Sequence, residues 1–581
     1  MPFSVPVGID DFRTLRELGL AYVDKSRLIR DLIDDRGAQV VLLPRPRRFG
    51  KTLNLSMLRA FFEKREEDLS HLFEGLDVWE SGPDYRAHFQ RYPTLHLTFK
   101  GTRFERPEEC WGAIKLKVER LFDAHRSLLT TGLLSDNEAR DYRAVLDGTA
   151  APPLFARSLL DLTTYLARLH GEKVILLIDE YDEPIHAGYM HGFLDRIVDP
   201  LRALLTEALK GNPHIEKAVL TGILRVAEEN IFSGLNNVSV STVLSHRHAT
   251  SFGFTEPEVD TLLTRAARTE AAPAVRAWYN GYLFGGQVIY NPWSVMSFLH
   301  NPEDRPRPYW VATSSNDLVK KLLTLHAPRL EADFEALLTG DSIPRSLEED
   351  VILTDLEDRP DALFSLLVFS GYLKAEEAKP DSAARPTHHL SIPNREVREV
   401  YTTTFRSFME LRMTAPGASL DRLVRSLLGG DAESFAEQLQ AFATSLLSYH
   451  DAAGKDPERV YHAFVIGLLA VLEPDYLVRS NRESGAGRPD VLVTPRTPGK
   501  PAALLELKVA RRGKRPPQAV LREALAQIRE RDYPAELRAA GASEVHAFAV
   551  AFDGIRVRVR SSAGRPTRLR AAPTACGSAV G

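Results

Sequence analysis

Two short groups of residues in this chain have the types and spacing that phosphate chemistry requires. The first is Gly50-Lys51-Thr52, which lies between an apolar run at 39–43 and the helical pattern LNLSMLRAFFEKR. In a phosphate-binding loop, N–H groups at a helix N-terminus receive the phosphates, a lysine neutralises charge and a hydroxyl binds Mg²⁺. We therefore predict that this loop binds ATP, and Thr52 also the metal, through Arg48, Phe49, Gly50, Lys51 and Thr52.

The loop departs from the general phosphate-loop pattern at one position. GxxxxGK[ST] requires a glycine at position 45, where this chain has Arg45 followed by Pro46. Gly-Lys-Thr is also a common tripeptide, so the alternative is an ordinary helix start without a catalytic role. The strand pattern before it and the helical pattern after it favour the phosphate-binding interpretation.

An acidic pair, Asp179-Glu180, follows a second buried strand at 173–178. Ligands of open α/β sheets bind at the carboxyl ends of the strands. We predict that Asp179 holds Mg²⁺ through water and that Glu180 polarises the attacking water. The alternative is a solvated acidic strand end. Thr221, at the end of the next strand, is a candidate γ-phosphate sensor and Arg225 a candidate phosphate contact, although Thr-Gly also forms ordinary turns.

The second group lies near the C-terminus and has the form D(x15)ExK. Glu506 and Lys508 are two residues apart in the apolar strand 502–509, so both side chains leave one face, and Asp490 precedes them. Two carboxylates can hold Mg²⁺ or Mn²⁺, and a lysine can orient or deprotonate water. We predict phosphodiester hydrolysis with Asp490 and Glu506 as metal ligands and Lys508 as a third catalytic residue. The alternative is a half-exposed edge strand with an ion pair.

Further residues near this group have open interpretations. Glu483 is either an additional acid or a partner of Arg482 or Arg488, and His462 fits a satisfied buried histidine better than a ligand. Two basic stretches are candidates for phosphate contacts or for ordinary solvated surface: Arg511 to Arg515, and the alternating Arg556, Arg558 and Arg560.

Long motifs along the chain resemble those of a known family. They are VDKSRLIRDLI, RPRRFGKTLNLSML, LIDEYDEPI, TGILRVAEENIFSGLNNV, WYNGYLFG, VIYNPWSV and FSLLVFSGYL, within about Gly8 to Phe552. They look like the AAA-ATPase-like proteins that carry a PD-(D/E)XK nuclease domain at the C-terminus. In that family the loop also reads RPRRFGKT, which makes Arg45 a family trait.

The resemblance implies roles for individual residues. It assigns Lys51 and Thr52 to the phosphates and Mg²⁺, and Asp179 and Glu180 to the acidic strand end. SNRESGAGRPD is similar to the family nuclease motif, and Gln527 matches a position near the scissile phosphate, against the alternative of a solvent-facing helix residue. Arg225 departs from the lysine or small residue expected there.

The elements that must position these residues form an α/β pattern. Apolar strands at 39–43, 95–99, 173–178 and 215–220 alternate with helical stretches, which predicts a parallel sheet. A helix at 461–472, three strands, a helix at 517–531 and a strand at 545–552 match the αβββαβ core of PD-(D/E)XK domains. The expected domains are an AAA-like P-loop domain (1–250), a helical lid or middle domain (251–400), a helical connector (401–455), a nuclease-like domain (456–564) and a disordered tail (565–581).

The composition of the chain limits the classes of protein to which it can belong. The 581 residues include 44% hydrophobic and 26% charged residues, only two cysteines and no run of roughly 20 apolar residues that could span a membrane. We expect a soluble cytoplasmic protein that holds metal through oxygen. Because the net charge is -4, a nucleic acid partner, most plausibly DNA, must be met by local basic patches.

The predicted function is an ATP-dependent, Mg²⁺-dependent nuclease. The alternative is a nucleotide-dependent switch or DNA-binding scaffold whose nuclease fold does not cleave.

Overall fold

The protein is described here by a computed structural model. It describes residues 3–223, 237–301, 303–310, 317–326, 330–377, 386–412, 419–446, 457–469, 472, 475–480, 489–510, 516–530 and 534–562. The chain divides into two compact units, the first formed by 1–326 and 342–398 and the second by 327–341 and 399–581. Each unit is described separately.

The first unit is built on a five-stranded parallel sheet with the order β2-β3-β4-β1-β5. β1, β3 and β4 are apolar and almost wholly buried, as expected for strands covered on both faces. The four strands predicted from apolar runs are therefore confirmed, and β5 adds an edge strand. The strands are β1 (Val40–Pro44), β2 (Thr94–Thr98), β3 (Val174–Asp179), β4 (Ile215–Gly222) and β5 (Val238–Val240).

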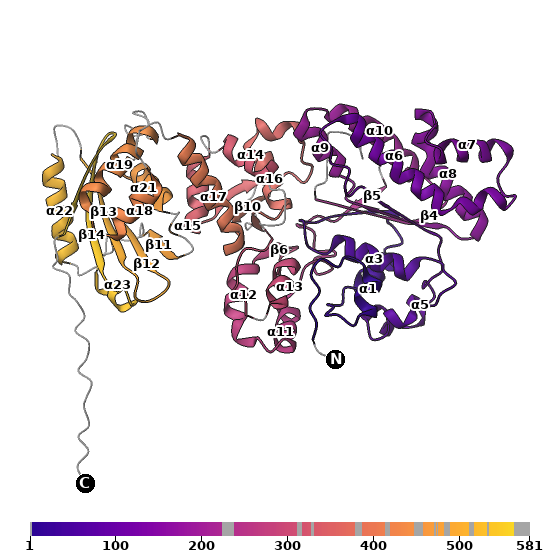
Figure 1. The fold of residues 1–581 in the computed structure, drawn as a ribbon, viewed down its shortest axis with the longest axis horizontal. Helices are drawn as coiled ribbons and strands as arrows, with labels where there is room; N and C mark the ends of the chain where they lie inside the picture. Colours follow the sequence, from indigo (N-terminus) through magenta and orange to yellow (C-terminus); the bar gives the residue numbers. More distant parts are fainter. Residues whose placement is uncertain are drawn as a thin grey trace, which may run out of the picture. The chain divides into compact units, whose positions relative to one another are not determined.

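Helices cover both faces of this sheet. Figure 1 shows α6, α8 and α10 on one side and α1 and α3 on the other. The helices of this part are α1 (Phe12–Glu17), α2 (Arg27–Asp34), α3 (Lys51–Phe62), α4 (Asp77–Glu80), α5 (Pro83–Arg86), α6 (Pro107–Ala124), α7 (Asp136–Leu146), α8 (Pro152–His170), α9 (Glu183–His191) and α10 (Leu194–Leu209).

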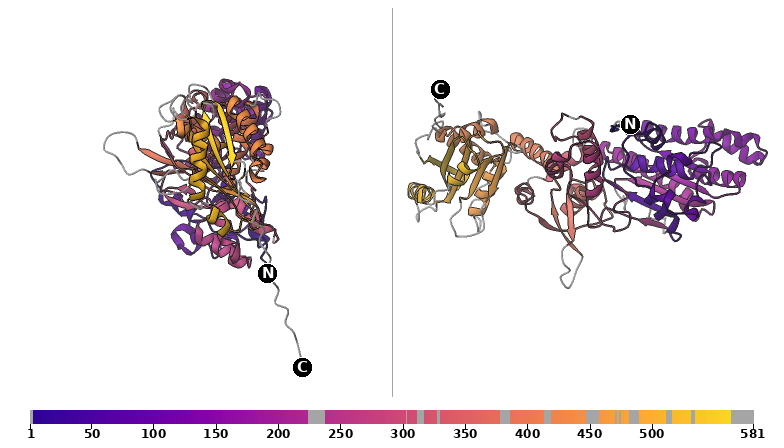
Figure 2. Two further views of the ribbon diagram at one scale, coloured as in Figure 1. Left: turned by 90° about the vertical axis from the view of Figure 1, so that its left-hand side faces the viewer. Right: turned by 90° about the horizontal axis from the view of Figure 1, so that it is seen from below.

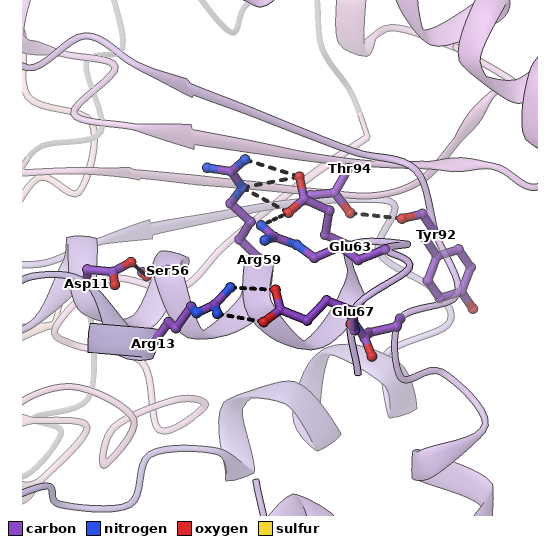
Figure 3. Close-up of polar contacts among 10 residues, drawn as sticks. Asp11, Arg13, Ser56, Arg59, Glu63, Glu67, Tyr92 and Thr94 are labelled. Atoms are coloured by element: carbon purple, nitrogen blue, oxygen red, sulfur yellow. Dashed lines mark hydrogen bonds and ion pairs between the residues drawn. The ribbon is translucent and has the colours of Figure 1, made fainter. Parts of the chain in front are cut away.

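Helix α3 follows the predicted phosphate-binding loop, and polar contacts hold its outer face (Figure 3). Ser56 of α3 donates to Asp11 at 3.0 Å, and Asp11 caps α1. Arg13 of α1 forms a two-pronged ion pair with Glu67, with N···O distances of 2.7 and 2.6 Å. Because the Arg13–Glu67 pair is exposed, water and salt screen it and it adds little to stability. These contacts nevertheless tie α1 and the segment after α3 to the helix that begins at the loop.

The middle of the chain is helical, as predicted, and also contains two small antiparallel sheets that the sequence pattern did not indicate. Phe49 of the loop packs against one of them, with its ring centroid 4.9 Å from that of Tyr282. The elements are α11 (Glu256–Arg265), α12 (Ala272–Tyr279), β6 (Tyr282–Phe284), β7 (Gln287–Ile289), α13 (Pro292–His300), α14 (Asp317–His326), β8 (Ile343–Ser346), α16 (Pro360–Phe369), β9 (Lys374–Glu377) and β10 (Thr387–Ser391).

The second unit is built on a mixed five-stranded sheet with the order β11-β12-β13-β14-β15. Only the β13–β14 pair is parallel, because α22 and α23 connect these two strands. The order helix, three strands, helix, strand confirms the expected αβββαβ core. The strands are β11 (Tyr476–Ser480), β12 (Val491–Pro495), β13 (Ala502–Val509), β14 (Val545–Asp553) and β15 (Arg556–Ser561).

The sheet of the second unit is also covered on both faces (Figures 1 and 2). Ala549 and Ala551 of β14 pack against Leu521 and Ala524 of α22. On the opposite face, the Phe548 ring is tilted against the Phe435 ring of α19, with the ring centroids 5.2 Å apart. The helices are α15 (Glu331–Thr339), α17 (Arg395–Arg412, which contains the boundary between the units), α18 (Leu420–Leu428), α19 (Ala432–Leu446), α21 (Pro457–Leu469), α22 (Pro517–Glu530) and α23 (Pro534–Ala539).

Candidate functional site

A cleft of about 610 Å³ lies in the first unit, where the loop after β1 meets the residues that follow β3. It has a charged region and an apolar region, as a site for a nucleotide requires. The apolar region includes Ile9, Tyr22, Phe254, Trp293 and Met296. The charged region includes Arg47, Lys51, Lys100, Arg103, Glu180, Asp182 and Glu183.

The predicted phosphate-binding loop has two residues in the left-handed region of backbone conformation. Gly50 caps α3 with φ +85°, and Arg48 also lies in the left-handed region with φ +66°. A non-glycine residue in that region costs about 1–3 kcal/mol and persists only where surrounding contacts impose it. The Arg48 guanidinium lies over the Trp293 ring at 4.3 Å, and this contact helps to hold the turn.

Lys51 is buried inside the loop. Its Nζ donates to the backbone oxygens of Arg45 at 3.0 Å and Pro46 at 3.1 Å. Burial lowers the pKa of Lys51, although Glu180, Asp182 and Asp179 oppose that shift. The ammonium group therefore has neutral carbonyls as its bonded acceptors, and a phosphate entering the cleft would supply a stronger, charged partner.

Asp179 joins two predicted site residues. Thr52 donates to Asp179 Oδ2 at 2.7 Å, and Thr221 donates to Asp179 Oδ1 at 2.6 Å. Asp179 is fully buried at the end of β3, and the strand order places β4 between β3 and β1. The structure thus brings Thr52, Asp179 and Thr221 together, in an arrangement that can share a hydrated Mg²⁺.

Glu180 forms a carboxyl pair with Glu183 beside this cluster. Glu180 has φ +51°, which is uncommon for a glutamate and places a strained residue at the cleft. Burial, the hydrogen bond with Glu180 and its charge raise the pKa of Glu183 to about 8. Burial opposes ionisation of Glu180, but the bond from Glu183 and the charges of Lys51 and Arg47 outweigh it and lower its pKa. Glu180 is therefore the ionised member of the pair at neutral pH.

Arg45 is a structural residue whose role sequence reasoning did not identify. Its side chain is fully buried and donates to the backbone oxygens of Ser241 at 2.6 Å and His248 at 3.2 Å. Its guanidinium lies 5.1 Å from the Phe252 ring centroid and 5.5 Å from that of Phe284. Burial lowers the pKa of Arg45 to about 9. Arg45 thus fixes the start of the loop where the general pattern has a glycine.

Residues distant from this loop in the sequence also brace it. The indole N–H of Trp310 donates to the Arg47 backbone oxygen at 3.2 Å. A Cβ at Gly371 would lie 3.0 Å from Pro46, so a larger residue there would push on the loop. Tyr282 of WYNGYLFG, which packs against Phe49, and Gly371 of FSGYL also position the loop, and only the tertiary contacts reveal this. Phe49 is buried and packs against Tyr282, so its side chain supports the loop and does not contact a phosphate.

The second group of predicted residues lies on and next to β13. Asp490 immediately precedes β12, and its Oδ2 accepts from the backbone N–H of Leu507 at 2.7 Å. That N–H lies between Glu506 and Lys508, so the three predicted residues meet at one point. β13 is a central strand, which contradicts the alternative of an edge strand, although the ion pair of that alternative is present.

Glu506 has the features of a carboxylate that accepts a cation. Its Oε1 accepts from Lys508 Nζ at 2.7 Å, while its buried Oε2 has no hydrogen-bond partner among the described residues. Burial, and then the charge of Asp490, raise the pKa of Glu506. An unpartnered buried carboxylate oxygen is costly, and a divalent cation beside Asp490 would satisfy it. The donor set therefore fits Mg²⁺ or Mn²⁺.

The remaining predicted residues are partly inside and partly outside the described residues. His462 is buried and its Nε2 lies 3.1 Å from the Asp490 backbone oxygen, which confirms a satisfied histidine. Gln527 is half-buried on α22, and its role stays a prediction. The three alternating arginines, Arg556, Arg558 and Arg560, are exposed on β15. Arg225, Glu483 and the basic run at 511–515 lie outside the described residues.

The described residues contain no group of three or more His, Cys, Asp or Glu side chains placed to hold a metal ion. The second site accordingly offers two acids, Asp490 and Glu506. In the described parts of the chain, no helix has the length and apolar character needed to cross a membrane.

Two stretches of the chain match known protein families. Residues 6–232 match the AAA-ATPase-like family, described as predicted AAA-ATPases, and residues 456–561 match the PD-(D/E)XK nuclease superfamily. The chain therefore combines an N-terminal AAA-ATPase-like domain with a C-terminal PD-(D/E)XK superfamily domain, as the resemblance indicated. It is also 28% identical over 559 residues to an uncharacterized protein in the vnfD 5' region of Azotobacter chroococcum mcd 1, covering 94% of this chain and 96% of that protein. The families indicate a nucleotide-binding, nuclease-like protein.

Proposed function

We propose that this protein hydrolyses phosphodiester bonds of nucleic acid, DNA in the first instance, at Asp490, Glu506 and Lys508, under the control of ATP bound at the N-terminal cleft. The observation that carries the nuclease assignment is the buried Glu506 Oε2 without a partner. It lies in a site whose second carboxylate is Asp490 and whose lysine contacts the other oxygen of Glu506.

In the nuclease site, Asp490 and Glu506 would hold Mg²⁺ or Mn²⁺. Bound there, the ion would polarise the phosphoryl group and lower the pKa of a bound water. Lys508 shares the site and, as an ammonium group, would orient the attacking water by donating a hydrogen bond. The hydrogen bond and charge of Glu506 raise the pKa of Lys508, although burial lowers it, so Lys508 begins as a proton donor and hydrogen-bond donor.

In the cleft, Gly50 and the following N–H groups of α3 would receive the phosphates of ATP, and Lys51 would leave the loop carbonyls to contact them. Mg²⁺ would be held by Thr52 and Asp179 and would neutralise phosphate charge. Thr221, which is hydrogen-bonded to Asp179, would sense the γ-phosphate, and Glu180 would align the attacking water.

Control of cleavage by ATP requires a coupling free energy between the two sites. This coupling can be measured by comparing cleavage with and without nucleotide. Purified protein is incubated with duplex DNA, single-stranded DNA and RNA, with Mg²⁺, Mn²⁺ or chelator, and with ATP, a non-hydrolysable ATP analogue or no nucleotide. We expect metal-dependent cleavage that chelator abolishes and that changes at least fivefold with nucleotide. Absence of cleavage on every substrate would favour the DNA-binding scaffold.

A further inference from the structure

The loop between β2 and α6, residues 99–106, brings two cations to the ATP cleft. Lys100 and Arg103 line the cleft together with Arg47, Lys51 and Glu180. Arg103 is exposed to the cleft, and Lys100 forms an ion pair with Asp10 at 3.0 Å. Neither the phosphate-loop pattern nor the acidic strand end accounts for a cation from this third segment.

This loop is anchored at the acidic end of β3. The Phe99 N–H donates to the backbone oxygen of Asp179 at 2.9 Å, and Thr102 folds back on Phe99 through its N–H and its hydroxyl, at 3.1 and 2.8 Å. The Gly101 N–H donates to Glu183 Oε1 at 3.0 Å. Because Phe99 and Thr102 are fully buried, the base of the loop is fixed next to Asp179.

The charges around Arg103 point to an anionic ligand. Burial and the nearby charge of Arg47 lower the pKa of Arg103, against the opposing charges of Glu183, Asp182 and Glu180. Arg47 and Arg103 line the same cleft, and both guanidinium groups would attract a polyphosphate bound there. The wall formed by Arg47, Lys51, Lys100 and Arg103 thus carries more positive charge than the loop motif alone supplies.

We infer that Arg103 is a catalytic arginine supplied by the same chain, which contacts the γ-phosphate of ATP during hydrolysis. This inference rests on the proposed ATPase function. In the step, the water oxygen bonds to the γ-phosphorus while the bond from that phosphorus to the β–γ bridging oxygen breaks. The electron pair stays on ADP, and the water proton passes through Glu180 to solvent, giving ADP, phosphate and H⁺.

The guanidinium of Arg103 can donate two parallel hydrogen bonds to γ-phosphate oxygens, whose charge changes as the bond breaks. The same loop contacts Glu183 through Gly101, and Glu183 pairs with Glu180. The arginine and the residue that aligns water are therefore held by one connected set of contacts. One chain would then supply both the arginine and the residue that aligns water.

The experiment compares wild type with Arg103→Ala, Arg103→Lys and the matched control Arg106→Ala. Arg106 is on the same loop, but its exposed side chain contacts Glu109 at 3.9 Å and does not line the cleft. We expect Arg103→Ala to bind a fluorescent ATP analogue within about threefold of wild type and to lose about 10³-fold or more in turnover. Arg103→Lys should recover only a small part, because it lacks the planar fork. Arg106→Ala should match wild type.

A mixing experiment separates an arginine from the same chain from one donated by a second chain. Arg103→Ala is mixed with Lys51→Ala, so that a donated arginine would restore turnover at a mixed interface. We expect no recovery, and we expect the wild-type turnover per molecule to be constant across a 100-fold range of protein concentration. Recovery on mixing would overturn the inference.

Two further outcomes are distinct from each other. If wild type hydrolyses ATP and Arg103→Ala does so equally well, the inference fails while the proposed function stands. If wild type binds no ATP or does not hydrolyse it, the proposed ATPase function itself fails, and the inference fails with it. Circular dichroism and thermal unfolding of each variant exclude a folding defect as the cause of lost turnover.

Discussion

The two candidate sites each contain a buried or half-buried lysine, and the two lysines are held in opposite ways. Lys51 donates to backbone carbonyls of its own loop, and burial lowers its pKa. Lys508 donates to the carboxylate of Glu506, and that contact raises its pKa in spite of burial. The N-terminal site therefore gains a charged partner when an anion enters. In the C-terminal site the anion is already present, so a metal ion must share Glu506 with Lys508.

The largest expected effect on nucleic acid cleavage is at the C-terminal site. Asp490→Ala and Glu506→Ala each remove one of two metal ligands, so we expect either change to lower metal-dependent cleavage by about 10²-fold or more, with little further loss in the double mutant. Single-turnover cleavage assays measure this. Asp475→Ala, which removes an exposed acid paired with Lys500 at 3.1 Å, is the control and should cleave normally. Cleavage that persists in both alanine variants would show that the site lies elsewhere.

The matching change at the N-terminal site is Lys51→Ala. The variant loses the cation that faces the β- and γ-phosphates, so we expect ATP affinity to fall about tenfold or more and turnover to be lost. Isothermal calorimetry and phosphate release measure the two effects. Lys210→Ala, at an exposed position after α10, serves as the control. If Lys51→Ala binds and hydrolyses ATP as well as wild type does, the interpretation of this loop as phosphate-binding is wrong.

A third change separates binding from hydrolysis in the same cleft. Glu180→Gln keeps the size of the side chain but cannot take a proton, so Mg²⁺-ATP should bind with an affinity within about threefold of wild type while turnover falls about 10²-fold. Glu105→Gln, an exposed glutamate, controls for the loss of one charge. Unchanged turnover would place water activation on another residue.

The fourth change tests the contrast between the two lysines directly. Lys508→Met removes the competitor for Glu506 Oε1 and leaves both carboxylates, so Mn²⁺ affinity should stay equal or rise a few-fold while cleavage falls. Electron paramagnetic resonance titration of Mn²⁺ measures the affinity. A large loss of Mn²⁺ affinity would mean that Lys508 is needed to assemble the carboxylates, and the contrast with Lys51 would not hold.

The smallest expected effect is on stability and follows from Glu183. Its folded pKa of about 8 lies above the ordinary value of 4.5, so the folded state retains a proton that the unfolded state releases. The contribution of Glu183 to the free energy of unfolding therefore falls as pH rises from about 4.5 to about 8 and is constant above that. Glu183→Gln should show less of this decline than wild type in urea unfolding at pH 5, 6, 7 and 8. The same slope in both proteins would contradict the shifted pKa, and Glu74→Gln, at an exposed position, is the control.

Much of the fold followed from local pattern. Apolar runs of five to eight residues identified the strands that carry Asp179, Thr221 and Glu506, because buried strands read as continuous hydrophobic segments. The i, i+2 spacing put Glu506 and Lys508 on one face of β13 without reference to any other part of the chain. The predicted domain boundaries and site roles remain predictions, since no observation tests them.

The sequence by itself determined the elements, the two motif groups and their chemical types. Only the tertiary structure decided that β4 lies between β1 and β3, so that Thr221 and Thr52 both bond to Asp179. It also decided that Arg45 is buried and that Arg103 reaches the N-terminal cleft. The physical reason is that strand order and loop docking depend on contacts between residues tens to hundreds of positions apart, for which a single sequence carries no local periodicity.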